Sequence, residues 1–484
     1  YILPLMICVL KNTLVPEEGA DPKAHRRVYR NERAADVSSW LLALKPSSPS
    51  LVFISWHHIS TWNDTRNTFM RRQRLQYCKA QQEAIKKPNA NQTNPTVVAF
   101  SYERPKAEIP HGFSQRQKLY AFNYVLNFTF SLAKILEKVG ITSEAYFLRT
   151  VMDVIPLLKD KHFFIKDLRF EKVKVRIYQP KISTTGQRRG ILYFHGGAGQ
   201  FGSIRSYERT CCYFGRKSDS VVVSVGYRLA PEHPYPAQFE DCLTATIHFM
   251  RTAQDYGVDP SRIIVCGDSS GGALTAAVAQ ALVNRRDLPK LRAQVLIYPF
   301  LQAVDFNLPS YQQNEQMLFL PKERALALGL KYLNKDLSVI KVVDKVSHIP
   351  EDLQLKYQKW VSPDHIPPEF KTRGYKPSTT RTFSKELYTL FKPVLDPVFS
   401  PLLAEDSVIA QLPEAFILTC EFDVLRDDGL LYKKRLEDNG IKVTWCHLQE
   451  GFHGTIFLTV WSVMTEFLSG HKGLEMIANF LRLT

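Results

Sequence analysis

From residue 170 to the C-terminus, apolar runs alternate with segments of helical periodicity. The runs are rich in Val, Ile and Leu, and they predict strands at residues 173–178, 190–194, 221–225, 263–266, 293–298, 416–420 and 443–447. Helical spacing fills most of the intervals, at residues 238–256, 273–284, 428–439 and 455–467. Near-continuous apolar runs are typical of strands buried on both faces of a parallel sheet. We therefore predict an α/β fold with a mostly parallel central sheet flanked by helices.

A separate helical pattern precedes the sheet. Ser114 and Gln117 have the spacing of a capping box, and Gly140 stands where such a helix would end. Between them apolar residues recur at helical spacing, at Leu119, Phe122, Leu126, Phe130 and Ala133. A second stripe is polar, and we expect it to face solvent: Asn123, Asn127, Ser131, Lys134 and Lys138. The glycosylation sequon at Asn127 would then be exposed, and further sequons begin at Asn63 and Asn91.

Two stretches do not continue the alternation of strands and helices. Residues 11–106 lack a sustained period, and over 100 residues rich in Pro, Lys and aromatics separate Tyr298 from Phe416. The apolar run Tyr1–Leu10 is shorter than the ~20 residues that cross a bilayer. The predicted domains are an irregular basic extension at 1–106, cap helices at 107–165, an α/β core at 166–300 and 413–484, and a helical cap insertion at 301–412.

The net charge of +16, from 63 basic and 47 acidic residues, raises the alternative of a nucleic-acid or membrane-surface protein. Half of this excess lies in residues 1–106, which hold 16 basic and 8 acidic residues. Arg71, Arg72 and Arg74 could contact phosphates, but no nucleic-acid-binding module surrounds them. We therefore predict a solvated basic face and no nucleic-acid partner. The eight cysteines include no C-x-x-C pair, and most are interpreted as small core residues.

The segment Gly267-Asp268-Ser269-Ser270-Gly271 matches G-x-S-x-G. It follows a predicted strand and opens a helix of small residues, the arrangement that raises a nucleophilic hydroxyl above a sheet. The alternative interpretation is that Ser269 only caps this helix. Because a serine hydroxyl is a poor nucleophile at neutral pH, a base and an orienting carboxylate are required.

Candidates for both groups follow later strands. Asp423 comes after the strand that ends near Cys420, and His453 lies in Gly451-Phe452-His453-Gly454 after the last strand. The chain order of Ser, Asp and His is that of α/β-hydrolases. Asp427, Asp428 and His447 compete for these roles, but the two acids suit a helix N-terminus and His447 lies within a strand.

Acyl transfer also needs N–H donors for an oxyanion. The loop His195-Gly196-Gly197-Ala198 follows a strand and supplies them, together with Ser270 after the nucleophile. The same loop contains a G-x-G-x-x-G at residues 197–202, the dinucleotide fingerprint. A nucleotide-binding domain would place an acidic residue at the end of the next strand, where this chain has Gly226-Tyr227-Arg228, and it would leave the Ser, Asp and His pattern unexplained.

These motifs, together with Tyr227-Arg228-Leu229-Ala230-Pro231-Glu232-His233 and Asp423-Val424-Leu425-Arg426-Asp427, resemble the hormone-sensitive-lipase branch of the α/β-hydrolases, and within it the arylacetamide deacetylase-like proteins. The resemblance covers residues 107–484 and not residues 1–106. It implies Ser269 as nucleophile, His453 as base and then acid, Asp423 as its orienter, and an oxyanion hole formed by Gly196, Gly197, Ala198 and Ser270. Many members have a third glycine where this chain has Ala198, so we expect altered or reduced activity.

The implied function is hydrolysis of apolar, neutral carboxylic esters or arylamides through an acyl-enzyme, with no metal or organic cofactor. The family typically places its catalytic domain in the endoplasmic-reticulum lumen behind a membrane anchor, and membrane association is an expectation that rests on this resemblance alone. Glu240 and Asp241 are expected to brace loops. Four aromatics of the cap region either line an acyl pocket or form cap core: Phe300, Phe306, Tyr311 and Phe319. The alternative function is a catalytically weak or silent hydrolase-fold binding protein.

Overall fold

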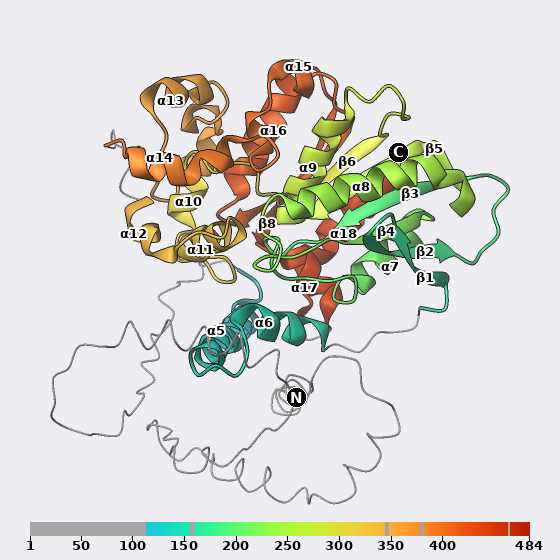
Figure 1. Ribbon diagram of the computed structural model, residues 1–484, viewed down its shortest axis with the longest axis horizontal. Helices are drawn as coiled ribbons and strands as arrows, with labels where there is room; N and C mark the ends of the chain where they lie inside the picture. The colour runs from blue at the N-terminus through green and yellow to red at the C-terminus, as the bar shows by residue number, and fades with distance from the viewer. Residues whose placement is uncertain (1–112, 155–159, 344–347, 378–381, 463–464) are drawn as a thin grey trace, which may run out of the picture. The chain divides into compact units, whose positions relative to one another are not determined.

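The computed structural model describes residues 113–154, 160–343, 348–377, 382–462 and 465–484 (Figure 1). The basic extension predicted at residues 1–106, the apolar run at its start and the sequons at Asn63 and Asn91 lie outside these residues. No helix in the described ranges combines the length and the apolar character needed to cross a membrane.

The core is one eight-stranded sheet in the order β1-β2-β4-β3-β5-β6-β7-β8. Strands β3 to β8 run parallel to one another, whereas β2 is antiparallel to both of its neighbours, β1 and β4. All seven predicted strands are present. The strand bounds are β1 Phe163–Phe170, β2 Val173–Pro180, β3 Arg188–Phe194, β4 Val221–Gly226, β5 Val258–Asp268, β6 Ala293–Ile297, β7 Glu414–Phe422 and β8 Val443–Phe452.

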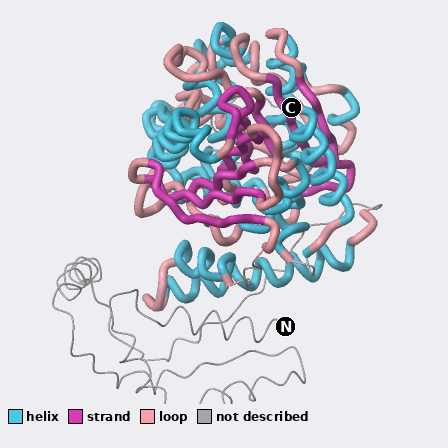
Figure 2. Tube along the Cα trace, turned by 90° about the vertical axis from the view of Figure 1, so that its right-hand side faces the viewer, coloured by secondary structure: helices cyan, strands magenta, loops and turns pink. Residues whose placement is uncertain are grey.

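Helices cover both faces of the sheet, as the alternation predicted (Figure 2). One apolar cluster includes Leu192 of β3 with side chains of α8 (Ala237–Thr252), α9 (Ser270–Leu282) and α16 (Arg426–Asp438). The neighbouring Ile191 and Tyr193 point the other way, into a cluster with α7 (Glu208–Ser218), α17 (Thr455–Trp461) and α18 (Leu468–Leu483). Because adjacent strand positions face opposite sides, burial on both faces requires the continuous apolar runs seen in the sequence.

The pattern missed several elements for identifiable reasons. Strand β1 lies at the sheet edge and is half exposed, so it lacks a continuous apolar run. Helix α18 has two glycines within its first six residues, and the helix predicted at 455–467 ends at Trp461. The predicted and observed elements therefore differ most where a segment has only one buried face or contains helix-breaking residues.

The first described helix, α5 (Arg116–Lys138), corrects two expectations. Its N-terminus has no capping box, because the Ser114 hydroxyl donates to Glu450 Oε2 at 2.5 Å instead. Gly140 does end the helix with a φ of +74°. The polar stripe does not face solvent throughout: Asn123 is buried, and Asn127 accepts a hydrogen bond from Arg324 at 3.1 Å. The Asn127 sequon is thus partly covered by another helix.

The cap is built from two parts of the chain. Helices α5 and α6 (Glu144–Asp153) precede the sheet, and the remainder lies between β6 and β7. Lys331 and Glu144 form an ion pair of 2.7 Å between the two parts. Figure 1 shows the helices of the insertion gathered on one side of the sheet. Their bounds are α10 Pro309–Gln313, α11 Lys322–Tyr332, α12 Ile340–Val343, α13 Glu351–Gln358, α14 Lys385–Phe391 and α15 Asp406–Ile409.

Helix α16 holds both ends of this insertion. Near its start, Asp428 accepts the backbone N–H of Leu301 at 2.9 Å. Two turns later, Arg435 donates to the carbonyls of Leu402 and Ala404. The insertion is therefore attached to the core through the helix that follows the Asp423 loop.

Candidate active site

Ser269 stands at the sharp turn between β5 and α9. Its φ of +56° and ψ of −121° are unusual for a residue with a Cβ, and such strain is concentrated at functional sites. The flanking glycines make the turn sterically feasible. A Cβ on Gly267 would lie 2.3 Å from the Gly271 carbonyl, and one on Gly271 would lie 2.1 Å from the Phe194 carbonyl. Only glycine fits at both positions.

The structure brings Ser269, His453 and Asp423 together in the order that the sequence predicted. His453 Nε2 lies 2.9 Å from Ser269 Oγ, and His453 Nδ1 lies 2.8 Å from Asp423 Oδ2. The other carboxylate oxygen of Asp423 accepts the backbone N–H of Leu425 at 2.9 Å. His453 and Asp423 are buried, which favours a strong interaction between imidazole and carboxylate. This geometry can transfer a proton from the serine hydroxyl to the histidine.

The competing residues have other partners. His447 Nδ1 lies 3.0 Å from the Thr419 hydroxyl and its Nε2 3.3 Å from Glu421. Asp427 pairs with Arg426 at 2.9 Å, and Asp428 accepts backbone N–H groups at the start of the insertion. None of the three contacts Ser269 or His453 among the described residues.

The predicted oxyanion loop contains one donor fewer than expected. Within the described ranges, the N–H groups of Gly197, Ala198 and Ser270 donate to no other residue. The Gly196 N–H, by contrast, donates to Asp268 Oδ1 at 2.9 Å. The assignment of Gly196 as an oxyanion donor is therefore wrong, because its N–H already holds the loop to the nucleophile turn.

Ala198 stands in the oxyanion loop where the sequence resemblance leads us to expect a third glycine. Its φ is +55°, in the left-handed region that glycine adopts more readily. An alanine there costs roughly 1 kcal/mol of local strain, but its N–H stays unpaired within the described structure.

Asp268 is a site residue to which the sequence pattern gave no role. Its buried carboxylate accepts the hydroxyls of Tyr193 and Tyr207, each at 2.9 Å, in addition to the Gly196 N–H. Burial raises the pKa of Asp268 to about 6, against the opposing effect of these three donors. The residue joins the nucleophile turn to the oxyanion loop. In the sequence, only its position next to Ser269 indicates that Asp268 belongs to the site.

Tyr227 and Arg228, which follow β4, make a second set of contacts near the oxyanion loop. The Tyr227 hydroxyl donates to the His195 carbonyl at 2.6 Å, and burial lowers the pKa of His195 to about 4. Arg228 forms ion pairs with Asp241 at 2.8 Å and Glu240 at 3.1 Å. The prediction that these two acids brace loops is confirmed.

Helix α6 also contacts the oxyanion loop. Arg149 donates to the Gln200 carbonyl at 2.7 Å and to the Ala230 carbonyl at 2.6 Å, and it pairs with Glu232 at 2.9 Å. The helices before the sheet are thereby tied directly to the loop that carries Gly197 and Ala198.

The four aromatics of the cap region have different environments. Phe300 and Phe306 line an apolar cavity under α11, and the Phe300 N–H donates to the Ser269 carbonyl at 3.2 Å. Tyr311 is buried against Phe306 and belongs to the core of the cap. Phe319 lies beside the site, with its ring centroid 6.2 Å from that of His453. Each interpretation thus holds for part of the set: Phe300 and Phe306 line a cavity, and Tyr311 belongs to the core of the cap.

Comparisons with known proteins agree with this fold. A family model described as "alpha/beta hydrolase fold" matches residues 191–356 and 350–457. Human arylacetamide deacetylase-like 4 is 47% identical over 72% of this chain and 86% of its own length. Bovine arylacetamide deacetylase is 39% identical over 72% of this chain and 89% of its own length.

Solved structures with the same fold include esterases. Carboxyl esterase 2 from Tuber melanosporum is 21% identical, with a TM-score of 0.52 over 68% of this chain and 88% of its own. LAE6, an α/β-hydrolase enzyme from the metagenome of Lake Arreo, is 25% identical, with a TM-score of 0.52 over 74% of this chain and 96% of its own. The identity to the deacetylase-like proteins, over most of their length, shows that this chain belongs to the arylacetamide deacetylase-like proteins of the α/β-hydrolase family.

Proposed function

We propose that this protein is a serine hydrolase that cleaves carboxylic esters through an acyl-enzyme. The observation that carries the proposal is the continuous hydrogen-bonded chain from Ser269 through His453 to Asp423. The N–H groups that have no partner among the described residues belong to the loop after β3, at Gly197 and Ala198, and to the first residue of α9, Ser270. Sequence similarity to arylacetamide deacetylases supports the same reaction class and does not favour a silent binding protein.

The reaction proceeds in two steps. Ser269 Oγ attacks the ester carbonyl carbon while His453 Nε2 takes the hydroxyl proton, and the carbonyl oxygen becomes an oxyanion that the loop N–H groups bind. Collapse of this intermediate breaks the bond to the leaving alcohol, which receives the proton from His453. Water then attacks the acyl-enzyme by the same proton transfers and releases the carboxylic acid.

The apolar surroundings favour neutral substrates. The imidazole of His453 lies beside the rings of Tyr298 and Phe319, with centroid separations of 5.0 and 6.2 Å. An ionised substrate would lose its hydration there without gaining a charged partner. We propose small apolar esters as substrates, and arylamides as a second class that the deacetylase relatives indicate.

A fluorophosphonate probe tests the nucleophile directly. We expect the full-length protein to be labelled, the Ser269→Ala variant not to be labelled, and a Ser270→Ala variant to keep labelling because its backbone N–H is retained. Folding of each variant is checked by circular dichroism and thermal unfolding. Absence of labelling in folded wild-type protein would refute the proposal. Comparing p-nitrophenyl acetate with an acetanilide then separates esterase from amidase activity.

We also propose that the catalytic domain faces the endoplasmic-reticulum lumen at a membrane. This proposal rests on the resemblance to deacetylase-like proteins. It is tested by endoglycosidase H treatment of the protein expressed in cells, combined with Asn63→Gln and Asn91→Gln. A mobility shift that these substitutions abolish would support luminal exposure, and unglycosylated protein in a cytosolic fraction would contradict it.

A further inference from the structure

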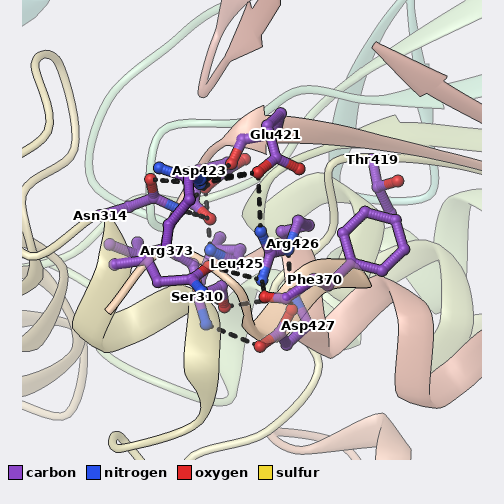
Figure 3. Close-up of polar contacts among 12 residues, drawn as sticks. Ser310, Asn314, Phe370, Arg373, Thr419, Glu421, Asp423, Leu425, Arg426 and Asp427 are labelled. Carbon is purple, nitrogen blue, oxygen red and sulfur yellow. Dashed lines mark hydrogen bonds and ion pairs between the residues drawn. The ribbon is translucent and has the colours of Figure 1, made fainter. Parts of the chain in front are cut away.

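Side chains of the cap insertion hold the main chain around Asp423 (Figure 3). Asp423 follows the last residue of β7; the register with β8 shifts between Cys420 and Phe422, and the last strand pair is Phe422 with Phe452, so the strand pairing ends before Asp423. Three carbonyls of the segment around Asp423 accept hydrogen bonds from the insertion. Asn314 Nδ2 donates to Asp423 at 2.9 Å, Arg373 Nη2 to Glu421 at 3.0 Å, and Ser310 Oγ to Val424 at 2.6 Å.

Asn314 is the central residue of this contact. It is only 2% exposed, and its amide also donates to the Glu421 carbonyl at 3.2 Å. Its carbonyl oxygen accepts from Arg373 Nη2 at 3.3 Å. A buried amide must be paired to avoid a desolvation penalty, and here its donors pair with the segment that carries the triad acid.

Ion pairs also hold the same segment. Arg373 pairs with Glu421 at 2.8 Å, and the fully buried Arg426 pairs with Glu421 at 3.2 Å and with Asp427 at 2.9 Å. Burial alone would raise the pKa of Glu421, but His447, Arg426 and Arg373 together lower it, so the carboxylate is ionised at neutral pH. Asp427 in turn accepts the Ser310 N–H at 2.6 Å. The Phe370 carbonyl accepts a hydrogen bond from Arg426 at 2.9 Å, so the insertion reaches the acid segment through residues 310–314 and 370–373.

We propose that Asn314 and Arg373 are positioning residues, by which the cap insertion holds Asp423 in line with His453. The inference rests on the proposed function, since it assigns a role toward the triad. Neither residue contacts His453 or Ser269. Asn314 acts through the carbonyls of Asp423 and Glu421, and Arg373 acts through the carbonyl and carboxylate of Glu421. A displacement of the acid by about 1 Å is enough to lower the rate by up to roughly a hundredfold, because catalysis depends on near-attack geometry.

The alternative is that these bonds only attach the cap and affect stability alone. Gln312 provides a matched control, because it lies two residues from Asn314 and also connects segments of the insertion that are distant in sequence, near Asn307 and Lys376. Its amide donates to the carbonyls of Asn307 and Lys376, each at 2.9 Å, and it makes no bond to residues 421–427 among those described. Loss of Gln312 should loosen the cap without releasing Asp423.

The experiment compares Asn314→Ala and Gln312→Ala in the full-length protein. kcat and KM are measured on p-nitrophenyl acetate, with thermal unfolding as the measure of folding. For Asn314→Ala we expect kcat to fall by roughly tenfold to a hundredfold with KM within about twofold. Gln312→Ala should leave kcat within about twofold of wild type. Arg373→Ala should resemble Asn314→Ala, and Arg373→Lys should recover part of kcat because a lysine still reaches Glu421.

The outcomes separate this inference from the proposed function. Folded Asn314→Ala with wild-type kcat would overturn the inference, as would equal losses for Asn314→Ala and Gln312→Ala. If Asn314→Ala fails to fold, the pair Arg373→Ala and Arg373→Lys decides, because Arg373 is about one-third exposed; equal kcat in both would overturn the inference. If wild-type protein shows neither labelling at Ser269 nor esterase activity, the proposed function itself fails.

Discussion

The buried carboxylate of Asp268 should contribute less to the stability of the protein at neutral pH than at mildly acidic pH, and Asp268→Asn should remove this pH-dependent contribution. Burial raises the pKa of Asp268 from 3.8 to about 6 in the folded protein. Between these pH values the folded state binds more protons than the unfolded state. The contribution of this residue to the free energy of unfolding therefore falls as the pH rises through that window, and it is fully lost above about pH 6.

The pKa difference sets the size of the effect. At about 1.4 kcal/mol per pH unit, the interval from 3.8 to about 6 corresponds to about 3 kcal/mol of unfolding free energy. Asparagine has nearly the same shape and keeps an acceptor for Tyr193 and the Gly196 N–H. Its amide group would face the Tyr207 hydroxyl, which can rotate to accept a hydrogen bond. The variant should therefore retain the loop contacts without a titratable group.

Urea unfolding of wild type and Asp268→Asn at pH 4 and pH 7.5 measures this difference. We expect the stability of the variant relative to wild type to increase by about 3 kcal/mol between the two pH values. Asp268→Ala is the companion variant. It leaves two tyrosine hydroxyls and one N–H without their partner, and should be less stable than Asp268→Asn by roughly 3 kcal/mol or more at both pH values. Parallel pH dependence in wild type and Asp268→Asn would refute the reasoning.

Two further predictions concern catalysis. Asp423→Asn should lower kcat by about 10⁴-fold with little change in folding, because the orienting charge and the histidine tautomer are lost; steady-state kinetics check this, and a loss below tenfold would contradict it. Gly197→Ala should lower kcat by about 10²- to 10³-fold. Gly197 has a φ of +108°, and a Cβ there would lie 2.6 Å from the Phe201 carbonyl, so the loop must shift. Unchanged kcat and KM would show that Gly197 is not part of the oxyanion site.

The sequence predicted the core and the proximity of Ser269, Asp423 and His453 because their signals are local. A strand buried on both faces needs a continuous apolar run, and the nucleophile turn needs glycines on either side of the serine. Each of the three residues follows a strand of the parallel part of the sheet, so the carboxyl ends of β5, β7 and β8 bring them to one edge.

The donors around the oxyanion loop could not be assigned from the sequence. Whether the Gly196 N–H is available depends on Asp268, which is 72 residues away in the chain. A glycine-rich loop shows which N–H groups are sterically accessible, but it does not show which of them a buried carboxylate already uses. The same limit applies to Asn127, whose exposure depended on Arg324 in another helix.

The cap insertion left even less signal, because its helices are short and are joined by polar contacts. From the sequence, Asp427 and Asp428 are expected only to suit the helix dipole, a general property of acids at helix N-termini. In the structure their carboxylates instead accept specific N–H groups of the insertion, at Ser310 and Leu301. Helix α16, which begins directly after the Asp423 segment, thus also binds the insertion. Of the triad residues, Asp423 is the one whose main chain is held by side chains of the insertion. We therefore expect a change in the cap to disturb the alignment of His453 by Asp423 more than it disturbs the turn that carries Ser269.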